Sequence, residues 1–329
     1  TTGYIKLNKF TANSYEEFLA VLEELQKPGL KALIYDLRGN GGGYMNEAID
    51  MADEFLDGDK LVVYTEGANS KKREYRCKRP GLFEEGRLVI LIDELSASAS
   101  EVLAGALQDW DRATIIGRRS FGKGLVQEQY PLSDGSAIRL TVARYYTPLG
   151  RSIQRAYGKG KKVYMDEIWE RYSNGEALYA DSNKVDNGKE YRTPEGHVVY
   201  GGGGVMPDIF VPIDTSTYPA AVNRLFANGS FNSFVYMYYL KHRPLVDSYA
   251  SAAEYMSRFP DEERLWNEFV QRAARDTVNL TALTPLQQEG LQRRLKAYLG
   301  RFRWRNSGYF QVLNQEDAMF KKALEIIKG

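Results

Sequence analysis

The feature that most constrains the fold is a short apolar segment that runs directly into a glycine-rich loop. Residues 31–37 (KALIYDL) form a near-continuous apolar run, which is typical of a strand buried on both faces. The loop RGNGGG follows at once, and the helical pattern NEAIDMADEFL comes after it. A buried strand that enters a helix through a turn is the building unit of an α/β fold, so this region predicts at least partly parallel strands.

The same alternation of strand and helix continues through the first half of the chain. Strand patterns occur at residues 3–10, 61–66, 87–93 and 113–117, and helical patterns at 16–27 and 101–110. From Gly124 the pattern changes, because residues 125–130 and 138–148 flank the turn residues SDGS and predict an antiparallel hairpin. We therefore expect an α/β core with a mixed sheet.

The second half predicts an insertion and then a helical segment. Residues 155–195 are polar and rich in tyrosine, and we interpret them as an insertion with a short helix. HVVY and DIFVP predict two late strands, and from about Ser216 the pattern is helical to the end. Thr284 and Pro285 fit the start of a helix. We expect a core at 1–215 and a helical C-terminal domain at 216–329.

Composition argues against several classes of function. The 44 basic residues nearly balance the 43 acidic ones, so no long-range field attracts nucleic acid. The run RFRWRN at 301–306 could stack bases, but in such a chain we favour a helix end with Phe302 and Trp304 packed inward. Cys77 is the only cysteine, which excludes intrachain disulfides and zinc sites built on cysteine pairs. We expect no metal and no cofactor.

The segment ELSASASE, residues 94–101, lies between a strand and a helix and has two interpretations. Ser98 and Glu101 fit a capping box, and taken alone the motif favours a simple helix cap. A serine at this turn also leaves the next amide, that of Ala99, pointing outward at the positive end of the helix dipole. That amide could stabilise an oxyanion formed by attack from Ser98.

The segment GRRSFGKG, residues 117–124, nearly fits a phosphate-binding loop. Gly124 stands where that loop needs a hydroxyl, so ATP binding is not favoured. Ser120 and Lys123 have the serine–lysine spacing of penicillin-binding enzymes, but the neighbouring glycines disfavour the helix that this chemistry needs. We therefore expect Lys123 either to serve a nucleophile elsewhere or to be an ordinary exposed loop lysine. In general, a lysine acts as a base near neutral pH only where desolvation favours its neutral form.

The glycine-rich loop at 37–43 leaves three interpretations open. Gly39 and Gly41, with Glu66 at the end of the next predicted strand, partly fit a dinucleotide loop, although Tyr44 replaces its third glycine. Free amides in a glycine-rich turn equally suit an oxyanion hole. The third interpretation is a plain tight turn.

Taken together and in order, these segments resemble one family. DLRGNGGG, SASASEVLAGALQD, GRRSFGKGLVQ, LTVARYYTPLGRSIQ and GGGGVMPD are similar to the carboxyl-terminal processing (tail-specific) proteases, which are serine–lysine peptidases with a ClpP/crotonase-like core. The resemblance implies Ser98 as nucleophile, Lys123 as general base and Gln127 as the residue that orients the lysine. It also implies oxyanion donors at Gly42, Gly43 and Ala99, and supporting roles for Glu101, Asp109 and Ser120, the last in place of the family's usual threonine.

The resemblance carries further expectations about the whole protein. It implies cleavage of extended or unfolded polypeptides near their C-terminal tails, in the periplasm or cell envelope. Family members usually carry a PDZ domain before the core, and we expect none ahead of Gly3. The C-terminal helices could form a homodimer interface or pack internally. Two other functions stay open: a non-catalytic peptide- or lipid-binding relative, and a dinucleotide-binding enzyme.

Overall fold

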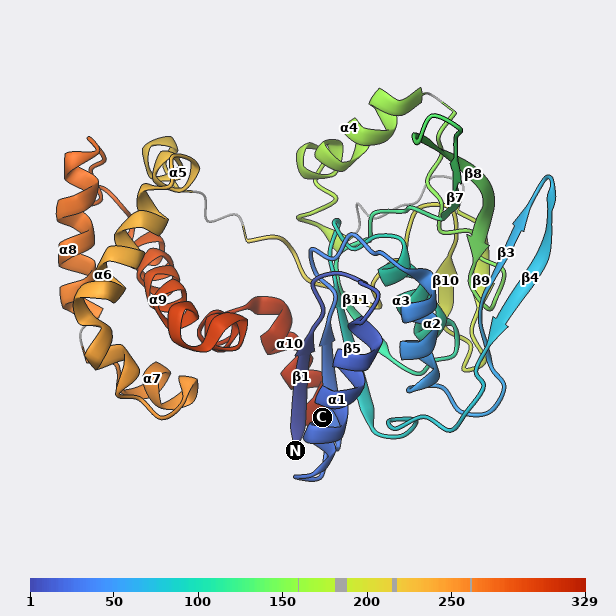
Figure 1. Cartoon of the computed structure of the whole chain (residues 1–329), viewed down its shortest axis with the longest axis horizontal. Helices are drawn as coiled ribbons and strands as arrows, with labels where there is room; N and C mark the ends of the chain where they lie inside the picture. Colours follow the sequence, from blue (N-terminus) through green and yellow to red (C-terminus); the bar gives the residue numbers. More distant parts are fainter. Residues whose placement is uncertain (159, 181–187, 215–217, 261) are drawn as a thin grey trace. The chain divides into compact units, whose positions relative to one another are not determined.

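The computed structural model describes residues 1–158, 160–180, 188–214, 218–260 and 262–329, and contacts divide them into two compact units (Figure 1). The first unit comprises Thr1–Ile213 and Lys322–Gly329, and the second comprises Asp214–Lys321. The boundary that the sequence predicts near residue 215 falls among residues 215–217, which lie outside the described residues.

A five-stranded parallel sheet forms the centre of the first unit. Its strands, in spatial order, are β1 (Thr2–Lys6), β2 (Ala32–Asp36), β5 (Arg87–Ile92), β6 (Thr114–Gly117) and β11 (Ile209–Phe210). Every neighbouring pair in this sheet is parallel. All five residues of β2 are buried, as the continuous apolar run predicts for an inner strand covered on both faces.

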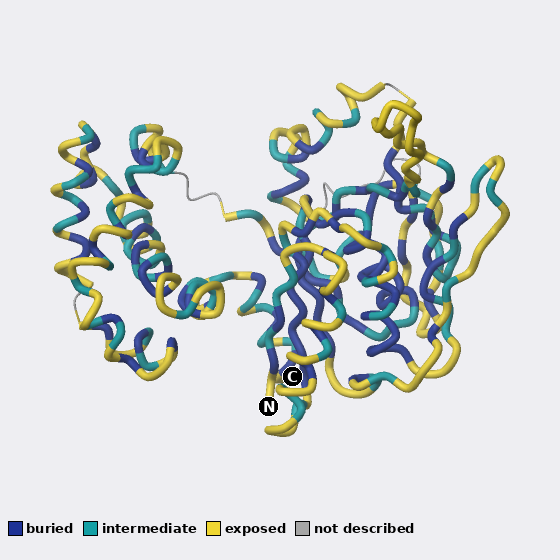
Figure 2. Tube along the Cα trace, in the orientation of Figure 1, coloured by how far each residue is buried: buried dark blue, intermediate teal, exposed yellow. Residues whose placement is uncertain are grey.

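Three helices lie together beside this sheet: α1 (Ser14–Gln26), α2 (Met45–Asp53) and α3 (Ala99–Asp109) (Figure 1). Helix α3 contacts β6 of the parallel sheet and β3 (Leu61–Gly67) of a second sheet, so it lies between the two. Every residue of α3 is buried (Figure 2). Glu101 and Asp109 are among these buried residues. A helix enclosed in this way must satisfy each of its polar side chains within the protein.

The second sheet of this unit is antiparallel and has the order β4 (Ser70–Arg76), β3, β8 (Ala137–Tyr146) and β7 (Leu125–Pro131). The predicted hairpin is β7 and β8, which pair from Leu125–Arg144 to Pro131–Ala137. The mixed α/β class is thus confirmed, but parallel and antiparallel strands occupy separate sheets. A helix inserted between them, α3, explains why they do not join.

The predicted insertion contains helix α4 (Gly160–Ser173) and a short strand, β9 (Glu190–Arg192). Strand β9 pairs antiparallel with β10 (Val198–Tyr200), which is the predicted strand HVVY. The other late strand, DIFVP, contributes β11 to the parallel sheet. Residues 159 and 181–187 of the insertion lie outside the described residues.

The second unit is helical in the part that the structure describes. Its helices are α5 (Ala220–Ala227), α6 (Ser230–Asp247), α7 (Ala252–Arg258), α8 (Glu262–Arg275) and α9 (Pro285–Leu313), while α10 (Ala318–Lys328) closes the chain. Thr284 caps α9 by accepting from the Gln287 amide, as predicted. Trp304 packs inward on Tyr255, with ring centroids 5.2 Å apart. The matching prediction for Phe302 is wrong, because this side chain is exposed and stacks on Tyr239 at the surface.

Within the described residues, no helix combines the length and the apolar character needed to cross a lipid bilayer.

Candidate active site

Ser98 occupies the N-cap position of α3 in a strained backbone conformation. Its φ and ψ are 58° and −114°, a region that residues other than glycine rarely adopt. Strain of this kind is found where a sharp strand-to-helix turn exposes a nucleophilic hydroxyl. Ser98 is half-buried, so its side chain is not closed off from solvent.

The glycine-rich loop packs directly against Ser98. A Cβ atom placed on Gly42 would lie 2.8 Å from the Cβ of Ser98 and 2.9 Å from the amide nitrogen of Ala99. Gly42 also has a φ of +91°, which favours glycine. The loop and the helix start could not approach so closely with any larger residue at this position.

Asn40, which sequence reasoning did not single out, joins the loop to the helix start. Its carbonyl oxygen accepts from the Ala97 amide at 3.0 Å and from Ser100 Oγ at 2.9 Å. Its side chain accepts from the Gly42 amide at 2.9 Å. Asparagine commonly bonds to the backbone two residues further along, so a sequence signal for this turn did exist.

The amides near Ser98 differ in their availability. The Gly42 amide is engaged by Asn40, which argues against its expected role as an oxyanion donor in this conformation. The amides of Gly43 and Ala99 have no hydrogen-bond partner among the described residues. The Ala99 amide also begins α3, where the helix dipole is positive. Of the three expected oxyanion donors, these two are therefore free to bind an anion.

The dinucleotide hypothesis does not fit this loop. Glu66 lies on β3 in the antiparallel sheet, and not at the carboxyl end of a strand parallel to β2. A ribose-binding carboxylate is expected next to the glycine loop at the edge of one parallel sheet.

Glu101 is fully buried and binds both segments that carry the predicted catalytic residues. Its Oε2 accepts from the amides of Ser98 and Lys123, each at 2.8 Å. Its Oε1 accepts from the Gly122 amide at 2.6 Å and from Ser120 Oγ at 2.5 Å. Burial raises the pKa of this carboxyl, and the four donors oppose that effect. Because the first two amides share one oxygen, their nitrogens lie no more than two hydrogen-bond lengths apart.

Lys123 is half-buried, and within the described part of the chain it forms no ion pair. Gln127 lies on β7 and is exposed. Among the described residues, the hydrogen bond from Gln127 to Lys123 that the resemblance implies is not formed in this conformation.

Ser120 is a buried structural hydroxyl. It is 1% exposed, donates to Glu101 and accepts from the Val205 amide at 2.7 Å. This geometry leaves no access for a substrate carbonyl, so it favours Ser98 over Ser120 as the nucleophile.

Asp109, at the far end of α3, supports the turn that follows β8. It forms a buried ion pair with Arg151 at 2.5 Å and accepts from the Leu149 amide at 2.9 Å. Gln154, three residues after Arg151, accepts from the Gly124 amide at 2.9 Å. The segment GRSIQ thereby holds the end of the loop that carries Lys123, a role that its sequence did not reveal.

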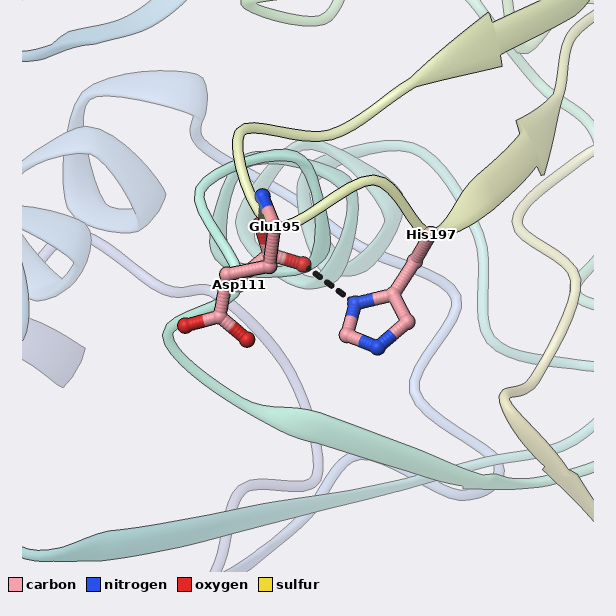
Figure 3. Close-up of side chains that lie close together, drawn as sticks. All are labelled: Asp111, Glu195 and His197. Atoms are coloured by element: carbon pink, nitrogen blue, oxygen red, sulfur yellow. Dashed lines mark hydrogen bonds and ion pairs between the residues drawn. The ribbon is translucent and has the colours of Figure 1, made fainter.

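A separate cluster lies at the end of α3 (Figure 3). Asp111, Glu195 and His197 place potential metal ligand atoms within 4.8 Å of one another. Both oxygens of Asp111 are already engaged, one by His197 Nδ1 and the other by the Glu195 amide, each at 2.8 Å. The cluster thus anchors the β9–β10 turn, and it borders a cavity of about 590 Å³ that none of the predicted catalytic residues lines.

Comparison with known families gives two matches along the chain. Residues 1–160 match Peptidase family S41. Residues 221–305 match DUF8443, a family of unknown function.

Curated relatives match somewhat less than half of this chain. The chain is 41% identical over 155 residues to a carboxyl-terminal-processing protease of Synechocystis sp., and 42% identical over 156 residues to a carboxy-terminal-processing protease of Bartonella bacilliformis. A third, the chloroplastic carboxyl-terminal-processing peptidase 3 of Arabidopsis thaliana, is 40% identical over 147 residues. These matches cover 47%, 46% and 45% of this chain, but only 36%, 36% and 28% of the relatives. The chain therefore spans about a third of their length.

Among solved structures, the photosystem II D1 C-terminal processing protease is 30% identical with a TM-score of 0.46. That match covers 64% of this chain and 42% of the other.

Proposed function

Since residues 1–160 of this chain belong to peptidase family S41, we propose that it is a serine endopeptidase with Ser98 as nucleophile and Lys123 as general base. The observation that carries the proposal is the shared carboxylate of Glu101, which binds the amides of both residues through one oxygen. The strained backbone of Ser98 and the free amide of Ala99 support the same assignment.

The proposed reaction is acyl transfer. Neutral Lys123 takes the proton from Ser98 Oγ, which attacks a peptide carbonyl and forms a tetrahedral intermediate. The amides of Gly43 and Ala99 donate to its oxyanion, a contribution that is typically worth roughly 10²–10³ in rate for one donor. Lys123 then gives its proton to the leaving amine. Water hydrolyses the acyl-enzyme, with Lys123 as the base a second time.

We propose extended or unfolded polypeptides as substrates, cleaved near their C-terminal tails. The support is the name that the relatives share, carboxyl-terminal-processing protease. The family resemblance also points to the cell envelope as the compartment.

The test is cleavage of an unfolded protein such as reduced casein by matched serine variants. Ser98→Ala should abolish cleavage, while Ser120→Ala should keep much of it because Ser120 only supports Glu101. The reverse ranking would move the nucleophile to Ser120. If wild-type protein binds unfolded peptides but never cleaves them, the chain is a binding relative and the peptidase proposal fails.

A further inference from the structure

The segment that carries Lys123, residues 117–124, is held from two sides. On its amide side, Glu101 accepts from Gly122 and Lys123. On its carbonyl side, α4 in the insertion supplies the side-chain partners of residues 119–122, and the Gly122 carbonyl oxygen also accepts from the Arg155 amide at 3.0 Å. Helix α4 begins at Gly160, where the match to family S41 ends, so Tyr164 and Arg171 lie outside the matched residues.

Arg171 of α4 binds three successive carbonyl groups of this segment. Its Nη1 donates to the carbonyl oxygens of Arg119 at 3.1 Å and Ser120 at 2.8 Å. Its Nη2 donates to the carbonyl oxygen of Phe121 at 3.4 Å. The Arg171 side chain is only 3% exposed, so little solvent can replace these bonds.

Tyr164, two turns earlier on α4, binds the next carbonyl. Its hydroxyl donates to the Gly122 carbonyl oxygen at 3.2 Å. Its ring packs edge-on against Phe121, with centroids 5.9 Å apart, and the Arg155 guanidinium lies over both rings. Helix α4 therefore binds the four carbonyl groups that directly precede Lys123.

Charge compensation holds Arg171 in place. Glu167 accepts from Arg171 at 3.0 Å and from Arg119 at 2.8 Å, and it also pairs with Arg155. Burial alone would raise the pKa of Glu167, but these arginines outweigh it and hold the pKa below its ordinary value. The buried guanidinium thus has a charged partner, so its charge is not left uncompensated beside the carbonyl groups.

We propose that Arg171 and Tyr164 are positioning residues for Lys123. They touch neither substrate nor reacting atoms, and act by fixing the backbone that presents the lysine to Ser98. This inference rests on the proposed peptidase function. A base displaced by about 1 Å can lose roughly 100-fold in rate, so loss of the α4 contacts should lower kcat more than it raises KM.

The test compares Arg171→Met with a matched control, Arg112→Met. Arg112 also donates to three backbone carbonyl groups, those of Phe55, Phe83 and Gly86, but it does not contact residues 117–124. For Arg171→Met we expect kcat to fall roughly 10- to 100-fold with KM little changed. The acid limb of the pH profile of kcat/KM should also move. In Arg171→Ala, millimolar guanidinium should restore part of the activity.

Two further readouts keep the proposal falsifiable. If Arg171→Met does not fold, Tyr164→Phe removes a single hydroxyl and should lower kcat in the same direction. Hydrogen exchange of residues 117–124 should be faster in either variant, and it can be measured even if the wild-type protein cleaves no substrate. The positioning role would be overturned if Arg171→Met left the pH profile of kcat/KM unchanged and lost only as much activity as Arg112→Met. It would also be overturned if hydrogen exchange at residues 117–124 stayed at the wild-type rate.

Discussion

Replacement of Glu101 by glutamine tests how the segments that carry Ser98 and Lys123 are joined. The substitution keeps the shape of the side chain but replaces one acceptor oxygen with an NH₂ group. Each Glu101 oxygen accepts from two donors, so either orientation of the amide places the NH₂ group against a pair of former partners. The better orientation turns NH₂ toward Ser120, because a hydroxyl can accept as well as donate. It leaves the Gly122 amide without an acceptor.

The magnitude for the Gly122 amide follows from the loss of its own hydrogen bond to Glu101. A buried donor left unsatisfied costs about 1–3 kcal/mol. This corresponds to a factor of roughly 5–150 in the equilibrium for local opening of the segment. In Glu101→Gln, the Gly122 amide should therefore exchange roughly 5- to 150-fold faster than in the wild-type protein.

Amide-resolved hydrogen exchange is the assay, with Glu85→Gln, an exposed glutamate, as the control. The acceleration should be confined to residues 117–124 and the start of α3. If the Gly122 amide exchanges at the wild-type rate, or if α1 accelerates as much, Glu101 does not act as the local junction described above.

Three further predictions follow from the same structure. Gly42→Ala should lower peptidase activity roughly 100-fold, because the new Cβ would lie 2.5 Å from the Ala97 carbonyl oxygen. Gly58 is the control: it has a similarly left-handed φ of +70° but open space around it, so Gly58→Ala should retain activity in the same assay. The hydrogen bond to Asp111 raises the pKa of His197. The stability that this interaction contributes should therefore be present below the ordinary histidine pKa and be lost as pH rises through the raised pKa. NMR titration should show this raised pKa, and Asp111→Asn should abolish it. Burial raises the pKa of Cys77 to about 12. Iodoacetamide should therefore modify this thiol at neutral pH only after the protein unfolds. Rapid modification of the folded protein would contradict the buried placement of Cys77.

Local patterns were sufficient to predict the elements around the site. The continuous apolar run of β2 reflects burial of both faces, which the order of residues records directly. The turn residues between β7 and β8 were sufficient to predict their pairing, although most residues of this hairpin are exposed. Separation into two sheets was not predictable in this way, because it depends on where α3 packs, and that is decided by contacts far apart in the chain.

The residues of the candidate site also fall into those that local motifs predicted and those that they did not. Ser98, Lys123 and Glu101 were accessible to motif reasoning because they stand in short characteristic segments. Gln154 and Arg171 were not, since each acts by binding backbone groups of a segment remote in sequence. Such contacts require only a donor or acceptor at the right place, so they leave no fixed spacing to detect. Engagement of the Gly42 amide by Asn40 is different, because it spans only two residues and a sequence signal for it existed.

The most direct test of the central assignment is the site of covalent modification by a fluorophosphonate, mapped by peptide mass spectrometry in the wild-type protein and in Lys123→Ala. The account predicts a single adduct on Ser98 that forms far more slowly without Lys123, with labelling retained in Ser120→Ala. An adduct on Ser120, or modification of Ser98 at the same rate with and without Lys123, would contradict it.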